Sequence, residues 1–531
     1  MEIPYKVGSR TPLFRPREAP PEAARMMHPA SLPSSSGGDD EGGSDSDGHD
    51  HISELPDHIK GSILSLLPLK DAGRTTKLSR HWKGVFAGSP ISLDDEHVSP
   101  RRVGRPRREV FLHAERVKII SRILKKHTGP IPRVRLAKTH FYGNNGYGLN
   151  TNAFAKRGVK ELIVHSTDAI RFFPAPPLRS VTLVKCDWFP TEQPLPPVFA
   201  GIKELSLHAV RFSAADVHAL LEQCVQLECL LLSSYHKDEK DRVIDIDATE
   251  DCRTLQIRSR SLRSLFLEIL GLEGVDIVDA PNLERLLGEV SFDKSYCQVT
   301  LVNAPKLQIL GFLTMSLPRT RIVFEDIKMM GMILEPSRPI HSIKILGLCL
   351  DLCNPFQVDQ MMQVLNYFPC VETLNIKIFT NASIRHTLYS EAPYANLLEM
   401  ARRIDCLRDS IKTIVLSDLW LHTDTFALQF AKILLESAKK LQLMKIFHVP
   451  VDKKKQARST RRRLGLKRDP SIKVRVVFPR DYISYRQVSD VLMGTSSLAM
   501  PNPMFYQRTF QSSHYIRMQW NSYLKPVKKY F

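Results

Sequence analysis

The stretch DAPNLERL at 279–286 is repeated in altered form as NAPKLQIL at 303–310, near the middle of the chain. Both copies carry an alanine and a proline followed by leucines at the same spacing. Similarity at a fixed interval indicates a repeat architecture, in which each copy is one small unit of structure. Because one unit cannot bury its apolar side chains alone, neighbouring units stack and share a continuous core.

An apolar-x-x-apolar-x-apolar pattern recurs on both sides of this pair. Each copy predicts one short strand whose inward side chains enter the shared core. The copies start 19 to 40 residues apart, which is the spacing of leucine-rich repeats with insertions. The ten clean copies are Val159-Leu162-Val164, Leu178-Val181-Leu183, Ile202-Leu205-Leu207, Leu227-Leu230-Leu232, Leu262-Leu265-Leu267, Leu307-Leu310-Phe312, Ile343-Leu346-Leu348, Val371-Leu374-Ile376, Ile411-Ile414-Leu416 and Leu441-Met444-Ile446, and Leu283-Leu286 is a degenerate eleventh.

Helical periodicity interrupts the strand pattern at defined places. Residues 213–224, 355–367 and 424–440 each precede a repeat strand, and ERVKIISRILKKH at 115–127 has the spacing of an amphipathic helix. The segment IKVRVVFP at 472–479 predicts a final strand.

A different pattern occupies the segment ISELPDHIKGSILSLLPLKDAGRTTKLSRHWKGVF at 52–86. Its apolar residues recur at helical spacing, and Pro56 suits the first turn of a helix. Pro68 ends that helix and can start a second, while a short third helix carries Trp82 and Phe86. Three short helices bury little surface by themselves, so we expect an apolar face to remain available for a partner.

The chain has 531 residues, more than a single hydrophobic core supports. The predicted fold class is therefore mixed α/β (α+β), a three-helix module followed by an irregular leucine-rich-repeat solenoid. We expect residues 1–50 to be a disordered acidic and proline-rich segment, 51–90 the helical module, 91–114 a basic linker, 115–450 the repeat domain, 451–470 a basic loop, and 480–531 an aromatic and basic tail with no assigned fold.

Several functional classes find no support in the residues. The nine cysteines are scattered singly without a CxxC pair, which predicts buried structural thiols in a reducing compartment and no metal site. The first twenty residues do not resemble a signal peptide, and no apolar run is long enough to span a membrane. The phosphate-loop, GxSxG and HExxH patterns are missing, so we expect no enzyme and no cofactor. The expected location is the nucleus, the cytoplasm or both.

The helical module resembles an F-box, and the chain resembles the plant F-box/leucine-rich-repeat proteins of the grass type. The Leu55-Pro56 opening, the Leu67-Pro68-Leu69-Lys70-Asp71 turn and the Leu78-Ser79-Arg80-x-Trp82 ending carry the F-box resemblance. LRSLFLEI and DAPNLERL resemble the family's repeats. IKTIVLSDLW and FAKILLESAKKLQLMKI resemble its C-terminal extension, so residues 402–478 are expected to be an FBD-like part.

The resemblance implies a non-catalytic subunit of a Skp–cullin–F-box ubiquitin ligase. The F-box would dock on a Skp-type adaptor, and through it on a cullin scaffold. The repeats would bind a client protein by their strand-lined face or the loops within 159–446. Ten residues would share docking and internal packing, without being assigned to either: Leu55, Pro56, Ile59, Ile63, Leu64, Leu67, Pro68, Leu69, Leu78 and Trp82.

The strong positive charge leaves an alternative open. Lysine and arginine number 75 against 56 acidic residues, a formal net charge of +19, which suits nuclear residence or an acidic partner. RRVGRPRRE at 101–109 resembles the core of a minor-groove hook. A second run could bind phosphate, direct nuclear import or be a solvated loop, and it holds Lys453, Lys454, Lys455, Arg461, Arg462, Arg463, Lys467 and Arg468. A nucleic-acid-binding protein, or a repeat scaffold without ligase association, is therefore the alternative function.

Overall fold

The structure is a computed structural model of the chain. It describes residues 51–98 except 96, 109–136, 154–165 except 155, 178–184, 199–210 except 200 and 209, 214–233, 254–268, 274–288, 297–314, 320–334 except 325, 326, 331 and 332, 339–378 except 353, 396–419, 425–448 and 473–477. The predicted disordered segment 1–50, the basic loop 451–470 and the tail 480–531 lie outside the described residues.

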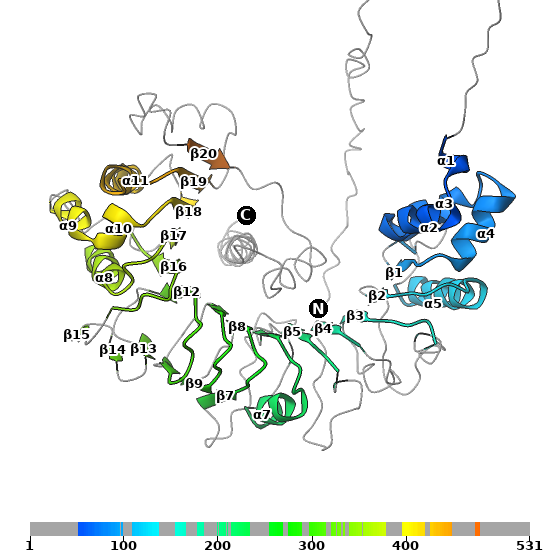
Figure 1. Ribbon diagram of the computed structural model, residues 1–531, viewed down its shortest axis with the longest axis horizontal. Coiled ribbons are helices and arrows are strands. Elements are labelled where there is room, and N and C mark those ends of the chain that lie inside the picture. The colour runs from blue at the N-terminus through cyan, green and yellow to red at the C-terminus, as the bar shows by residue number, and fades with distance from the viewer. Residues whose placement is uncertain are drawn as a thin grey trace, which may run out of the picture. The chain divides into compact units, whose positions relative to one another are not determined.

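A sheet of fourteen parallel strands forms the backbone of the repeat domain (Figure 1). Its strands follow chain order, as expected when each repeat adds one strand beside the last. Eleven of them coincide with the eleven predicted repeat copies, and β20 confirms the predicted final strand. In sheet order they are β1 Ser92–Asp94, β2 Arg133–Leu136, β3 Glu161–His165, β4 Ser180–Val184, β5 Glu204–His208, β6 Cys229–Ser233, β8 Ser264–Glu268, β10 Arg285–Gly288, β12 Ile309–Thr314, β16 Ile345–Leu350, β17 Thr373–Ile378, β18 Thr413–Leu419, β19 Leu443–His448 and β20 Lys473–Val477.

The register of the sheet aligns the apolar positions of successive repeats. Leu205 pairs with Leu230, and Leu230 pairs with Leu265. All three are at most 1% exposed and belong to one continuous core cluster. Because each strand supplies side chains that the next strand covers, the core extends from repeat to repeat, which confirms the stacking predicted from the sequence.

The central repeats carry a second sheet that the sequence did not predict. Its order is β15-β14-β13-β11-β9-β7, and its strands β7, β9, β11 and β13 are parallel. Leu255, Ile277 and Leu301 from this sheet enter the same core cluster. The strands are β7 Thr254–Arg258, β9 Gly274–Asp279, β11 Cys297–Leu301, β13 Thr320–Phe324, β14 Ile327–Met330 and β15 Ile333–Leu334.

The repeated segment DAPNLERL/NAPKLQIL forms the turns between the two sheets. Equivalent positions of its two copies bond to each other. The side-chain amide of Asn303 donates to Asp279 Oδ1 over 2.8 Å, and Lys306 Nζ donates to Asn282 Oδ1 over 2.7 Å. The sequence repeat therefore corresponds to a repeat of the three-dimensional structure.

One strand departs from the predicted pattern. The register of β12 against β16 shifts between Leu310 and Leu313, so Leu313 pairs with Leu348 and enters the core. The sequence motif had assigned this paired position to Phe312, whereas the register gives it to Leu313. The bulge coincides with Gly311, whose φ of 153° and close approach to Gly347 leave no room for a side chain.

Helices cover the core side of the repeats. The predicted helices are confirmed as α7 Ala214–Gln223, α8 Pro355–Asn366 and α11 Thr425–Ser437, and α9 Leu397–Arg403 and α10 Asp405–Asp409 accompany them. Their buried apolar residues, among them Leu220, Met361 and Leu434, all join the core cluster. Helices α7 to α11 therefore lie on one side of the long sheet, as Figure 1 also shows.

The helical module comprises the three helices α2 Asp57–Leu66, α3 Leu69–Thr75 and α4 Arg80–Gly88, and α1 His51–Glu54 precedes it in the sequence. The following segment, 91–114, was expected to be a linker, but it contributes β1 to the sheet and the start of α5 Glu109–Lys126. The amides of Thr128 and Gly129 both donate to the carbonyl oxygen of Ala87 over 2.9 Å, and Ile91 donates to Pro130. The C-terminal end of α4 is thus joined to the first repeat by backbone hydrogen bonds.

Candidate docking site in the helical module

Two prolines and one serine mark where the helices of the three-helix module begin. Pro56 and Pro68 precede α2 and α3 with φ near −59° and −54°, values that proline favours at a helix start. Ser79 caps α4, where its Oγ accepts a hydrogen bond from the Trp82 amide over 3.2 Å. The predicted helix boundary at Pro68 is confirmed.

The module has a small core of its own. Leu64, Ala72, Trp82 and Val85 form a buried cluster, with Leu67 and Phe86 packed against it. Trp82 is 4% exposed, and it brings α4 against α2 and α3. In the free protein the Trp82 side chain therefore serves internal packing.

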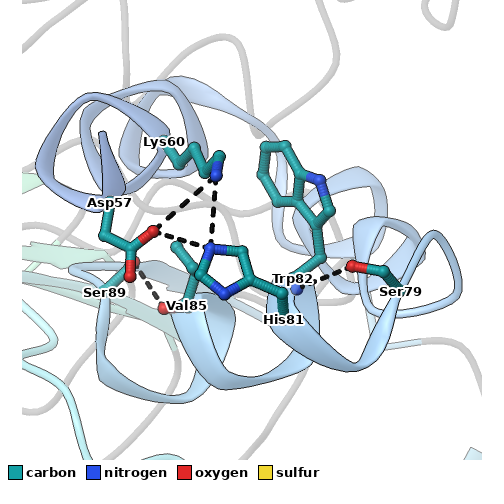
Figure 2. A network of polar contacts seen from close by, with 7 residues as sticks. All are labelled: Asp57, Lys60, Ser79, His81, Trp82, Val85 and Ser89. Carbon is teal, nitrogen blue, oxygen red and sulfur yellow. Dashed lines mark hydrogen bonds and ion pairs between the residues drawn. The ribbon is translucent and has the colours of Figure 1, made fainter. Parts of the chain in front are cut away.

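A network of polar contacts lies beside this core, next to the Trp82 ring (Figure 2). His81 Nε2 lies 2.7 Å from Asp57 Oδ1 and 3.2 Å from Lys60 Nζ. The Lys60 side chain is only 3% exposed, and its ammonium group is also 3.7 Å from Asp57 Oδ1. A buried ammonium is costly to desolvate unless it is paired, so this network fixes α2 against α4.

Helix α2 is apolar on two faces. One face places Leu64 in the core, and Gly61 packs so closely that a Cβ there would lie 3.0 Å from Ser89 Oγ. The other face carries Ile59, Ile63 and Leu66, which share one side of the helix at spacings of four and three residues. We call these three residues the α2 apolar stripe; they are 38%, 37% and 86% exposed.

Exposed apolar side chains concentrate in this module. Within the described residues, eight large apolar side chains are well exposed, and five of them lie between Ile52 and Leu78. Leu78, just before α4, is 67% exposed. Isolated exposed apolar residues are ordinary, whereas a concentration of them marks an interaction surface.

The structure divides the ten predicted docking residues by burial. Leu64, Leu69 and Trp82 are buried; Leu55 and Leu67 are half-buried; Pro56, Ile59, Ile63, Pro68 and Leu78 are exposed. Leu69 belongs to the core cluster of the repeats and not to the core of the module. Leu66, the most exposed large apolar residue among those described, was missing from the ten. The sequence offered one signal for Leu66: it lies two residues after Leu64, and therefore on a different side of the helix.

Other chemistry finds little support in the described part of the chain. There, no three histidine, cysteine or acidic side chains gather as metal ligands, and no helix could cross a membrane. Burial raises the pKa of the Cys224 thiol to about 11 and that of Cys406 to about 12, which suppresses thiolate formation. The predicted basic residues from Lys453 to Arg468 lie outside the described residues.

A helical module with an exposed apolar stripe, followed by a solenoid of leucine-rich repeats, defines an F-box/LRR-repeat architecture. The F-box domain family matches residues 52–91. A second family, described as "FBD-associated F-box protein At5g56370, LRR repeats", matches residues 151–376. The chain therefore carries an F-box domain followed by leucine-rich repeats, which is the domain combination of the plant F-box/LRR-repeat proteins that it resembles.

Similar proteins from Arabidopsis thaliana carry related descriptions. "F-box/FBD/LRR-repeat protein At1g13570" is 26% identical over 35% of this chain and 44% of its own length. "Putative F-box/LRR-repeat protein At3g58880" is 27% identical over 60% of this chain and 70% of its own length. "F-box/LRR-repeat protein At5g02910" is 42% identical, over 11% of this chain and 13% of its own. The matches to several of these relatives span half of their length or less.

Proposed function

We propose that this protein is the substrate-recognition subunit of a Skp–cullin–F-box type ubiquitin ligase. Its F-box docks on a Skp-type adaptor, its repeats hold a client protein, and other subunits perform the chemistry. The single observation that carries the proposal is the α2 apolar stripe, Ile59, Ile63 and Leu66, exposed on a module whose own core is complete without it. The similarity to plant F-box/LRR-repeat proteins supports the same role.

The physics of this docking is apolar burial. Covering a leucine or isoleucine side chain contributes about 1.5–3 kcal/mol, and a few such anchors dominate protein interfaces. The internal residues Leu64 and Trp82 act indirectly, because they hold α2 and α4 in the geometry that presents the stripe. Docking of this kind responds weakly to salt, unlike binding to a phosphate backbone.

The test is co-purification of the full chain with a Skp-type adaptor. We expect stoichiometric capture that survives about 0.5 M salt, since apolar contacts are not screened. Leu66→Ser should weaken the complex by about 2 kcal/mol, roughly 30-fold in Kd. Val225→Ser is the matched control, because Val225 is 70% exposed but lies in the repeat domain.

Each contrary result points to a different conclusion. Equal losses from Leu66→Ser and Val225→Ser would assign the effect to general surface hydrophobicity. If several Skp-type adaptors fail to bind while the F-box remains folded, the ligase role is wrong. Nucleic-acid binding that falls steeply with salt would then favour the alternative based on the basic runs.

A further inference from the structure

Equivalent positions of successive repeats form a row along the edge of the long sheet where the strands begin. From Lys160 on, each residue of this row immediately precedes its strand and donates its backbone N–H to the carbonyl oxygen of the row residue before it. Arg179 donates to Lys160 over 2.8 Å, Lys203 to Arg179 over 2.9 Å, and Glu228 to Lys203 over 2.8 Å. Neighbouring strands lie about 4.8 Å apart, so side chains of consecutive row residues can interact.

Where the row offers opposite charges, they pair across neighbouring strands. Lys203 Nζ donates to Glu228 Oε1 over 2.6 Å, and Arg263 donates to Glu284 Oε1 over 2.7 Å. All four residues belong to consecutive positions of the row. From Lys203 to Glu284 the charge of the row is therefore neutralised by its own neighbours.

The first repeats break this pattern, because the row is basic there. Lys160 and Arg179 occupy consecutive positions, and both side chains are exposed. Within the described residues, neither side chain forms an ion pair or a hydrogen bond. Like charges opposite each other in a sheet are destabilising, so the stability of the repeats does not explain this arrangement.

Helix α5 adds positive charge at the same end of the repeats. Its core face carries Ile120 and Leu124, whereas Arg122, Lys125 and Lys126 are exposed. Like charges three and four positions apart weaken a helix, and Arg122 has both kinds of neighbour. The helix dipole favours cations in the last turn of α5, but it has no bearing on the cations of the row.

Arg157 joins the end of α5 to the turn before β3. Its guanidinium donates to the carbonyl oxygen of Leu124 over 3.1 Å and to that of Thr128 over 2.7 Å. Its own carbonyl oxygen accepts from the Ile131 amide over 2.8 Å. Lys156, next to Arg157 in the chain, is exposed. The two segments therefore lie side by side, and their cations share one surface.

Six exposed cations of this surface form no side-chain ion pair within the described residues, and few acidic groups are near them. Between residues 114 and 208 the described side chains include twelve lysines and arginines against three glutamates. Glu161 is 3.4 Å from Arg133, and burial raises the pKa of Glu204. We call the six cations the basic edge: Arg122, Lys125, Lys126, Lys156, Lys160 and Arg179.

The shape and composition of the basic edge favour a polypeptide over a nucleic acid. From the last turn of α5 across β2 to β4 it extends about 15–20 Å, which an extended segment of about six residues spans. Single-stranded nucleic acids are held largely by aromatic side chains on which the bases stack. Residues 116–133, 156–160 and 178–180 contain no phenylalanine, tyrosine or tryptophan. Carboxylates in an extended chain are the complement that remains.

We propose that the basic edge binds an acidic segment of a partner protein, rich in glutamate or aspartate and extended along the starts of β2 to β4. Binding replaces the repulsion between neighbouring cations by ion pairs. The surface belongs to the repeat domain and does not require adaptor docking, so the two proposals can fail separately.

Fluorescence anisotropy of a labelled peptide tests the proposal on the full chain. The probe alternates glutamate and serine over about ten residues, long enough to span the basic edge, and its glutamine counterpart is the neutral control. We expect only the acidic probe to bind, and its binding should weaken as salt rises from about 0.05 M to 0.5 M. The combined variant Lys156→Glu, Lys160→Glu and Arg179→Glu should bind about tenfold more weakly, since three exposed contacts are lost.

The matched control combines Lys432→Glu, Lys439→Glu and Lys440→Glu. These lysines are exposed on α11 or just after it, and their reversal changes the net charge by the same amount. We expect a Kd within about twofold of the wild type, because distant exposed charges are screened. Both variants should keep the wild-type thermal midpoint, since surface substitutions rarely affect stability. Equal losses of binding would assign the attraction to net charge and overturn the proposal.

Zero-length carbodiimide cross-linking locates the bound peptide on the wild-type chain. The reagent joins a peptide carboxylate to a lysine amine that it contacts, so adducts should map to Lys125, Lys126, Lys156 or Lys160. Adducts confined to other lysines would overturn the proposal, as would unchanged affinity in the basic-edge variant. Tighter binding of duplex DNA, lost in that variant, would assign the surface to nucleic acid instead. If the thermal midpoint of the variant falls, the cross-link decides, because it needs no substitution.

Discussion

The ammonium nitrogen of Lys60 lies 5.8 Å from the centroid of the Trp82 ring, inside the F-box module. Figure 2 shows both side chains beside the Asp57–His81 contact. A lysine is rarely buried without compensation. Here the compensation comes from the Trp82 ring face and from Asp57 and His81.

This relationship predicts how Lys60 variants rank. Lys60→Met keeps the aliphatic stem beside Trp82 and removes both the charge and its desolvation penalty, so local stability should change by less than about 1 kcal/mol. Lys60→Ala leaves a cavity and should destabilise α2 and α4 by about 2 kcal/mol or more. Hydrogen exchange of the α2 and α4 amides measures both. Equal losses from the two variants would show that the charge, not the packing, is what matters.

Alanine should have opposite effects at Gly129 and Gly73, because only Gly129 lies close to another backbone segment. A Cβ at Gly129 would lie 2.5 Å from the carbonyl oxygens of Gly88 and Ser89. These oxygens cannot move without breaking the joint, by which we mean the backbone hydrogen bonds between the end of α4 and the first repeat. Gly129→Ala should destabilise the joint by about 1–3 kcal/mol. Exchange of the Thr128 and Ile91 amides reports the change.

Gly73 is the matched control for that experiment. It lies inside α3, and a Cβ there would meet no atom of the described residues within 4 Å. Gly73→Ala should therefore stabilise α3 by up to about 1 kcal/mol through helix propensity. If both alanines destabilise, steric space is not the deciding factor.

His127 predicts a pH dependence for the same joint. Its ring packs edge-on against Phe86 at a centroid distance of 5.7 Å. Burial, and secondarily the charge of Arg157, lower its pKa below the usual 6.5, although the nearby carbonyl groups of Pro130, Ser89 and Phe86 partly oppose this. Between the lowered pKa and 6.5 the unfolded state binds more protons than the folded state. Stability should therefore fall as pH drops through 6.5, and level off below the folded pKa.

Amide exchange at Thr128 and Gly129 between pH 7.5 and pH 5, corrected for intrinsic rates, measures this effect. In His127→Gln the loss of protection on acidification should be smaller, because no proton can bind there. An unchanged pH profile in that variant would assign the effect to another group.

The ion pairs between repeats should contribute little. Arg263 donates to Glu284 Oε1 from Nε over 2.9 Å and from a terminal nitrogen over 2.7 Å, and both residues stay partly exposed. Pairs of this kind contribute about 0–1 kcal/mol. Arg263→Gln should therefore lower the thermal midpoint only slightly.

Gly311→Ala should have a far larger effect on the same midpoint. Its φ of 153° disfavours a side chain, and a Cβ would lie 2.7 Å from Gly347 Cα on the next strand. Thermal unfolding of the two variants side by side separates the contributions. Similar midpoints would contradict the view that backbone packing, not surface charge, holds the repeats together.

Repetition made much of the fold predictable. The motif containing Leu230 predicts its strand because eleven similar units each repeat the same local pattern. At Phe312 the prediction failed by one residue, because a bulge is decided by contacts with β16 rather than by local spacing. The second sheet was not predicted, and its strands pair only with each other.

The docking residues were only partly predictable. Leu64 and Leu66 are both leucines on α2, two positions apart, yet one is buried in the module and the other is 86% exposed. Helical periodicity cannot separate the two when a helix is apolar on both faces. Burial of Leu69 in the repeat core depends on how the F-box joins the first repeat.

The sequence by itself determined the repeat architecture, the helix boundaries at Pro56 and Pro68, and the F-box signature, because these depend on backbone restriction and periodicity along the chain. Only the tertiary structure decided which apolar side chains face a partner. Exposure is a property of the packed assembly: Trp82 is buried by residues from three helices, and Leu66 is left outside by the same packing. The long sheet follows the same logic, since the register of its successive strands places Ile163 and Phe266, about a hundred residues apart in the chain, in one row across the sheet.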